Sequence, residues 1–187
     1  MLFLKVLRIE VGAGTHIWSG NLFKSLRGLH VGEHCTMMRF NRATAIPAFR
    51  RVSDADPELV GVLWLGDHVL ITKGHALDCS GGVVMESWSA IAGRETLVYS
   101  HSYDPSQHEL TCAVTRICET SMIAARTTLA SGSTLPKGSI LAMGSTLMPG
   151  KSKEYCLYAG MPARAVREVT DWAFLGHRDM ARPPIRK

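Results

Sequence analysis

The sequence lacks three features that would each indicate a particular class of protein. Its five cysteines are odd in number and form no Cys-x-x-Cys pair, which argues against a disulfide framework or a structural zinc site and for a reducing, cytoplasmic compartment. No stretch approaches the roughly 18 to 20 apolar residues of a membrane-spanning helix. No basic segment is interleaved with aromatic residues, so the net charge of +5 does not indicate nucleic-acid binding.

The N-terminus is apolar but has no unbroken hydrophobic region. Lys5, Arg8 and Glu10 interrupt the run MLFLKVLRIEV, so we expect a first strand or short helix there and not a secretory signal. The length of 187 residues is enough to bury a core and suggests one domain.

Aliphatic residues recur at every sixth position in the C-terminal half of the chain. The series is Ile117, Ile123, Leu129, Leu135, Leu141 and Leu147. Small hydroxyl residues follow the first five members by four positions, at Ser121, Thr127, Ser133, Ser139 and Ser145. If about one residue in four is a large aliphatic, such a register arises by chance roughly twice in ten thousand trials.

A period of six matches neither a helix nor an ordinary strand, but it matches a triangular solenoid. Each hexad then forms one short strand with its aliphatic residue on the axis and its small residue in the corner, and three hexads close one coil. The step recurs upstream, with a slip of two at Gly81-Gly82, at Leu65, Ile71, Leu77, Met85, Ile91 and Leu97, and a weaker coil is suggested by Val31 and Met37. A β-sandwich is the alternative, although its strands need not keep a common spacing.

These patterns divide the single domain into three parts. Residues 1–28 are an N-terminal extension, residues 29–150 a mainly β solenoid, and residues 151–187 a connection, a short helix and a tail. Polar inserts at 41–61 and 102–112 must leave the stack, and such loops often carry binding groups. Pro162 followed by Val166, Val169 and Phe174 predicts an α-helix from Ala163 to Phe174.

Three segments of the sequence carry a family resemblance. They are LDCSGGVVMESWSAIAGRETLVYSHSYDP, ICETSMIAARTTLASGSTLPKGSILAMGSTL and YAGMPARAVREV. Together they resemble the hexapeptide-repeat acyltransferases, which include galactoside, maltose, serine and xenobiotic acetyltransferases, over roughly residues 63 to 170. The resemblance implies a left-handed parallel β-helix, acetyl transfer from coenzyme A and a homotrimer with active sites between neighbouring subunits.

Acyl transfer from a thioester to a hydroxyl needs a base, and histidine suits that role because its pKa lies near neutrality. His101 stands at a corner position, opens the second insert and falls on the family's active-site histidine. We therefore predict that His101 is the catalytic base. His108 and Asp104 in the same insert are candidates for the acceptor pocket, although Asp104-Pro105 also matches a turn. His75 and Asp78, one coil earlier, are candidates for the pocket wall.

The resemblance also implies a coenzyme A site along the C-terminal coils. By position, the small-residue stretches that would admit pantetheine are Ala125 and Met143-Gly144-Ser145. Arg164 matches the basic position of the closing motif and would meet the nucleotide phosphates, with Lys151 or Lys153 as weaker candidates. A cysteine nucleophile is disfavoured because none of the five cysteines lies beside a histidine in this interpretation.

We predict O-acetylation of a sugar or glycan-precursor hydroxyl, with no metal, no nucleic-acid partner and no membrane span. N-acetylation of an amino sugar and acetylation of an antibiotic-like acceptor are alternatives. A zinc enzyme of the γ-carbonic anhydrase type would need three imidazoles, nominally His75, His101 and His108. A non-catalytic scaffold is the remaining alternative, because the glycine that often follows each aliphatic residue in the family is replaced here.

Overall fold

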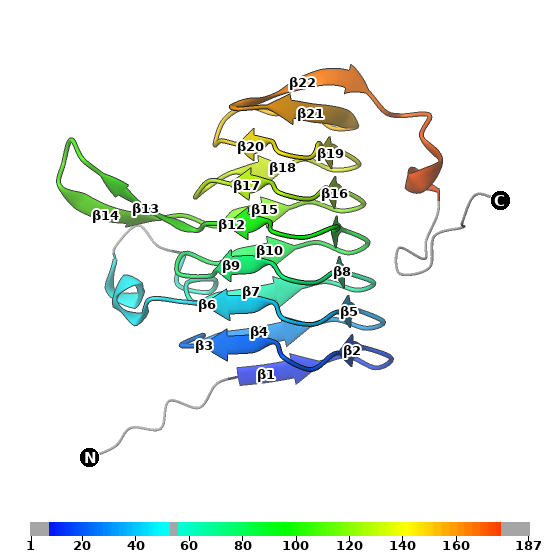
Figure 1. The fold of residues 1–187 in the computed structure, drawn as a ribbon. Helices are drawn as coiled ribbons and strands as arrows, with labels where there is room; N and C mark the ends of the chain where they lie inside the picture. Colours follow the sequence, from blue (N-terminus) through cyan, green and yellow to red (C-terminus); the bar gives the residue numbers. More distant parts are fainter. Residues whose placement is uncertain (1–7, 53–55, 177–187) are drawn as a thin grey trace, which may run out of the picture.

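A computed structural model describes residues 8–52 and 56–176 of the chain (Figure 1). The fold is the predicted left-handed parallel β-helix, in which each coil contributes one short strand to each of three parallel sheets. The coils stack from the N-terminal end at the bottom of Figure 1 to the C-terminal end at its top. The six-residue period arises because one strand and one corner use about six residues.

The three sheets run the length of the solenoid. The first sheet contains β1 (Arg8–Val11), β4 (Gly28–Val31), β7 (Val62–Leu65), β10 (Val83–Met85), β15 (Thr115–Ile117) and β18 (Thr134–Leu135). The second contains β2 (His16–Ile17), β5 (Thr36–Met37), β8 (Leu70–Ile71), β11 (Ala90–Ile91), β16 (Met122–Ile123) and β19 (Ile140–Leu141), and ends with β21 (Cys156–Gly160) and β22 (Ala163–Glu168). The third contains β3 (Leu22–Lys24), β6 (Arg42–Thr44), β9 (Ala76–Asp78), β12 (Leu97–Val98), β17 (Thr128–Leu129) and β20 (Thr146–Leu147).

The aliphatic ladder predicted from the spacing forms the core. All six residues of the series from Ile117 to Leu147 are buried, as are Leu65, Ile71, Leu77, Val31 and Met37. The five hydroxyl residues that follow them are buried too, and Ser121 Oγ donates a hydrogen bond to the Cys118 carbonyl across its corner. The two sequence series therefore correspond to the axis and the corners, as predicted.

The ladder departs from the prediction at Leu97. Leu97 is 39% exposed, whereas its neighbour Val98 is 1% exposed and points to the axis. The reason is that this coil carries one extra residue, so Ile91 and Val98 are seven positions apart. The buried corner residue that follows is Ser100. The prediction that His101 stands at a corner position is therefore wrong, because the extra residue shifts the corner and His101 is the first residue beyond it.

The solenoid begins earlier than the predicted boundary at residue 29. Strands β1, β2 and β3 form a first coil, and β1 pairs with β4 in parallel register from Arg8 opposite Gly28 to Val11 opposite Val31. Of the apolar N-terminal run, the described residues Arg8–Val11 form a strand. The described part of the predicted extension is a coil of the solenoid itself.

Both inserts leave the stack on the same side of the molecule (Figure 1). The first keeps β6 in the third sheet, with Ala43 buried, and departs only after Thr44 into the 3-10 helix η1 (Pro47–Arg51). The second is an antiparallel hairpin of β13 (His101–Asp104) and β14 (Glu109–Cys112). The hairpin projects beyond the coils and sets one wall of the site described below.

The predicted helix from Ala163 to Phe174 is wrong. Ala163–Glu168 is the strand β22, which pairs antiparallel with β21 after a turn at Met161-Pro162, and only Ala173–Leu175 form a short 3-10 helix, η2. The edge of the second sheet offers β22 hydrogen-bond partners that a local pattern cannot reveal. The predicted tail from residue 177 onward lies outside the described residues. Among the described residues, no helix has the length and apolar character needed to cross a membrane.

Candidate active site

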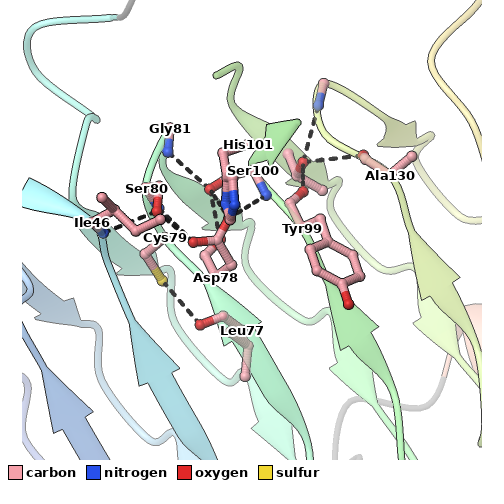
Figure 2. A network of polar contacts seen from close by, with 12 residues as sticks. Ile46, Leu77, Asp78, Cys79, Ser80, Gly81, Tyr99, Ser100, His101 and Ala130 are labelled. Carbon is pink, nitrogen blue, oxygen red and sulfur yellow. Dashed lines mark hydrogen bonds and ion pairs between the residues drawn. The ribbon is translucent and has the colours of Figure 1, made fainter. Parts of the chain in front are cut away.

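The candidate site lies where the chain turns from the third sheet into the hairpin. Ser100, in the buried corner, donates from its hydroxyl to the Asp78 carbonyl at 2.6 Å and from its amide to the Asp78 carboxylate at 2.9 Å (Figure 2). Asp78 is the last residue of β9, in the coil below. A Cβ on Gly81 would collide with the Ser100 carbonyl and the Ala113 backbone, so glycine permits this close packing of coils.

His101 and Asp78 form a close pair. The His101 Nδ1 atom lies 2.6 Å from Asp78 Oδ2, and the two side chains are 26% and 13% exposed (Figure 2). The buried ring of Phe49 from η1 lies 5.4 Å from the imidazole, measured between ring centroids. An ionised carboxylate can only accept a hydrogen bond, so the proton of a neutral His101 sits on Nδ1 and Nε2 is left as the free base.

Asp78 is held in its ionised form. Burial alone would raise its pKa, but hydrogen bonds from the Ser80 hydroxyl, the Ser100 amide and the His101 ring outweigh that effect and lower the pKa below its usual value. The Ser80 hydroxyl donates at 2.5 Å. The carboxylate therefore fixes the tautomer and orientation of His101 and stabilises the imidazolium that proton uptake would create.

The third sheet is hollowed on both sides of His101. An upper hollow of about 430 Å³, toward the C-terminal coils, is lined by Tyr99, His101, Ser102, Tyr103, Leu110, Thr128, Ala130, Ser131, Thr146 and Met148. A lower hollow of about 460 Å³, toward the N-terminal coils, is lined by Leu22, Lys24, Arg42, Thr44, Ile46, Ala76, Leu77, Asp78, Leu97, Val98, Tyr99 and His101. His101 and Tyr99 line both, so two substrates entering from opposite ends would meet at the imidazole.

The other predicted acceptor residues lie apart from the pair. His75 is a buried corner residue: its Nδ1 accepts from the Thr96 amide at 3.2 Å and its Nε2 pairs with the Thr72 hydroxyl at 2.9 Å. Burial lowers the pKa of His75 to about 4. It is therefore a neutral structural group and not a pocket wall.

The hairpin tip holds the remaining two. Asp104 accepts hydrogen bonds from the amide and the hydroxyl of Ser106, which is the turn arrangement that the sequence also suggested. His108 is exposed and lies 2.6 Å from the Tyr103 hydroxyl through its Nδ1 atom. The structure does not bring His75, His101 and His108 together, and the described residues contain no cluster of three or more His, Cys, Asp or Glu side chains that could hold a metal ion.

The residues predicted for coenzyme A fall in two places. Ala125, Met143, Gly144 and Ser145 lie at the corner between the second and third sheets, where Ser145 is buried and the Gly144 amide donates to the Ala125 carbonyl at 3.1 Å. The opposite side of the third sheet, near the C-terminal end, carries a cleft of about 630 Å³. Arg164 lines this cleft together with Lys151 and Lys153.

The cationic cleft and the upper hollow are adjacent, because Met148 lines both. Together they form a path along the C-terminal coils from three cations to His101. The sequence did not predict Met148 and Tyr99 as site residues, because the six-residue pattern does not distinguish one outward-facing residue of a strand from another.

One sequence-based exclusion is also wrong. Cys112 lies directly opposite His101 in the hairpin register, so a cysteine does lie beside a histidine. The pairing becomes evident only once the second insert is recognised as a hairpin whose ends are His101 and Cys112. Cys118, by contrast, has its pKa raised to about 11, chiefly by burial and also by Glu86, which makes it a poor nucleophile.

No protein-family model and no curated protein matches the chain. Among solved structures it is similar to AntD, an N-acyltransferase from Bacillus cereus. A mutant of AntD in complex with dTDP and coenzyme A superposes with a TM-score of 0.66 and 15% identity, covering 87% of this chain and 84% of that chain.

Two further AntD structures give the same result. A mutant with dTDP-4-amino-4,6-dideoxyglucose and coenzyme A has a TM-score of 0.66 and 15% identity, over 85% of this chain and 83% of that chain. AntD with dTDP and 3-hydroxybutyryl-CoA has a TM-score of 0.64 and 16% identity, over 85% and 82%. At these identities the likeness confirms the fold.

Proposed function

We propose that this chain is an acyl-CoA-dependent acyltransferase in which His101 is the general base and the acceptor is a sugar hydroxyl. The observation that carries the proposal is the His101–Asp78 pair, 2.6 Å apart, set between two hollows of the third sheet. A base oriented by a buried carboxylate at the meeting point of two binding surfaces is what direct acyl transfer requires.

The acyl donor is assigned to the C-terminal side of His101. Lys151 and Arg164 supply positive charge for the phosphates of coenzyme A, whereas Lys153 is paired with Glu168, and the path past Met148 leads to the upper hollow. Tyr103 and Leu110 from the hairpin, with Ala130, give that hollow apolar walls suited to an acyl chain. AntD, which has the same fold, was solved with coenzyme A and with an acyl-CoA.

The proposed mechanism is direct. His101 Nε2 accepts the proton of the acceptor hydroxyl while that oxygen attacks the thioester carbonyl, and Asp78 stabilises the imidazolium. The tetrahedral intermediate collapses, the carbon–sulfur bond breaks and the coenzyme A thiolate leaves. The imidazolium returns the proton to that thiolate, so His101 ends the cycle neutral and no acyl-enzyme forms.

An amine acceptor is the second candidate. It is favoured by AntD, an N-acyltransferase that was solved with a dTDP-linked amino sugar. His101 would then remove a proton from the ammonium intermediate after attack. We also propose a homotrimer, because Leu97, Tyr99 and Leu110 expose a large part of their apolar surface beside the hollows.

The proposal is tested by a thiol-release assay with acetyl-CoA and longer acyl-CoAs against sugars, sugar phosphates, nucleotide sugars and amino sugars. We expect His101→Ala to lower kcat by roughly 10²- to 10⁴-fold with little change in coenzyme A affinity. Asp78→Asn should also lower kcat, by up to about 10⁴-fold, because the base remains but its preferred tautomer is lost.

Cys112→Ser is the matched control for a covalent route. Direct transfer predicts that this variant keeps kcat within about twofold, a change below 0.5 kcal/mol. Loss of turnover in Cys112→Ser with retention in His101→Ala would replace His101 by a cysteine nucleophile. Absence of thiol release with every acceptor would favour the non-catalytic scaffold.

A further inference from the structure

The lower hollow has an unusual charge for a sugar pocket. Its charged lining residues are Lys24 and Arg42, both exposed, and Asp78. The Asp78 carboxylate is already engaged by His101. Among the described residues that line the hollow, no further carboxylate balances the positive charge of Lys24 and Arg42.

Neither cation has a side-chain partner among the described residues. Within residues 8–52 and 56–176, the side chains of Lys24 and Arg42 form no ion pair and no hydrogen bond. Two surface cations elsewhere do have carboxylate partners: Lys137 lies 2.6 Å from Glu119, and Arg126 lies 2.9 Å from Glu95. Lys24 and Arg42 are thus free to meet an anion.

The position of the two cations is fixed by the strand register. Lys24 is opposite Thr44, which is opposite Asp78, so Lys24 lies two strands below the residue that holds His101. At about 4.8 Å per strand this separation is about 10 Å. Arg42 is opposite Ala76 one strand above Lys24, on the second outward-facing row of the same sheet. A sugar ring with its hydroxyl at His101 would place a substituent on its far side near both cations.

The charge nearby favours a group with several anionic oxygens. Arg50 from η1 donates to the Ser25 carbonyl at 3.1 Å, next in sequence to Lys24, and adds positive potential. Lys supplies a point charge and Arg a fork that binds phosphate oxygens in pairs. Two cations on separate rows match a phosphate or diphosphate better than a single carboxylate.

Resting on the proposed function, we infer that the acceptor is a sugar carrying a phosphate ester or diphosphate, which Lys24 and Arg42 bind in the lower hollow. The donor then enters along the C-terminal coils and the acceptor along the N-terminal coils. Lys24 and Arg42 are specificity-determining residues in this arrangement, because they select charged over neutral acceptors without contacting the reacting atoms.

The first experiment compares kcat/KM for glucose, glucuronic acid, glucose 1-phosphate and UDP-glucose, and for the corresponding amino sugars. We expect the phosphorylated acceptors to be preferred, and the sugar 1-phosphate and the nucleotide sugar show whether the anion is a monoester or a diphosphate. Lys24→Gln and Arg42→Gln should each reduce the phosphorylated-to-neutral ratio by about tenfold or more. Lys73→Gln, an exposed lysine that lines neither hollow, is the matched control and should leave that ratio unchanged.

A second readout does not depend on turnover. With coenzyme A saturating, inorganic pyrophosphate should raise the melting temperature of the wild type and of Lys73→Gln, but not of the Lys24→Gln/Arg42→Gln double variant. If these melting-temperature shifts were observed but no acceptor gave thiol release, the anion site would be supported and the proposed function would be overturned. Three outcomes would overturn the inference and leave the proposed function standing. They are efficient transfer with no preference for phosphorylated acceptors, a preference for glucuronic acid, and a pyrophosphate-induced rise in melting temperature that persists in the double variant. If there is no thiol release and also no pyrophosphate shift, both the inference and the proposed function are overturned.

Discussion

At the scale of single residues, two histidines lie in opposite environments. His101 follows a buried corner and keeps one ring nitrogen facing the hollows, with the other bonded to Asp78. His75 occupies a corner and has both nitrogens bonded inside the protein. The difference is why His101 is the proposed base, because a base must reach its substrate, whereas the buried neutral imidazole of His75 has both nitrogens occupied inside the protein.

His75 predicts a pH-dependent stability. Its folded pKa of about 4 lies below the unfolded value of 6.5, so the unfolded chain binds more protons between these values. Stability is fully present above pH 6.5 and is lost as the pH falls toward 4, by up to roughly 1.4 kcal/mol per pH unit. The physical cause is burial, which disfavours the charged imidazolium.

Urea unfolding at several pH values between about 7 and 4 measures this slope. His75→Asn should remove much of it, even though the variant is less stable overall. His108→Asn, at the exposed hairpin tip, should not alter it. If the unfolding free energy depended on pH with the same slope in His75→Asn and the wild type, groups other than His75 would cause the loss of stability at acid pH.

At the scale of elements, the hairpin β13–β14 contributes to the site while contributing little to the core. Tyr103 and Leu110 face each other across the hairpin, line the upper hollow and are 49% and 58% exposed. We expect the double variant Tyr103→Ala/Leu110→Ala to raise the KM for acyl-CoA, because it removes an apolar wall. The free energy of unfolding should change by less than about 1 kcal/mol.

Steady-state kinetics and urea unfolding of the same preparation test this prediction. Val166→Ala removes a comparably exposed apolar side chain from β22 and should leave the KM unchanged. If the hairpin variant lost several kcal/mol of stability, the hairpin would be part of the core instead of a wall of the site.

At the scale of the whole molecule, the aliphatic ladder holds the coils together. Leu135 is fully buried between neighbouring coils, whereas Leu97, which the six-residue step would also place on the axis, is 39% exposed. Leu135→Ala should therefore cost about 2–5 kcal/mol and Leu97→Ala about 1 kcal/mol or less. Denaturant unfolding of the two variants compares the same chemical change at two positions, and equal losses would contradict the register described for β12.

Much of the architecture follows from the sequence alone. The six-residue spacing of aliphatic and hydroxyl residues predicts the triangular solenoid, because axis and corner positions impose different residue types at a fixed interval. His101 could be singled out because it falls on the family's active-site histidine and opens the second insert, although the structure places Ser100 and not His101 in the corner. Asp78 could be placed only one coil away, and its bond to His101 could not be foreseen.

Tertiary structure decided what depends on contacts between distant parts of the chain. It made β22 a strand, because the edge of β21 supplies hydrogen bonds that local propensity cannot show. It moved the axis residue from Leu97 to Val98, paired His101 with Cys112 across the hairpin, and placed Lys24 and Arg42 in the lower hollow. The spacing determined the coil, because each coil repeats one local geometry. The arrangement of the candidate site could be seen only in the tertiary structure, because its residues come from coils and inserts that are brought together by the parallel stacking of the strands.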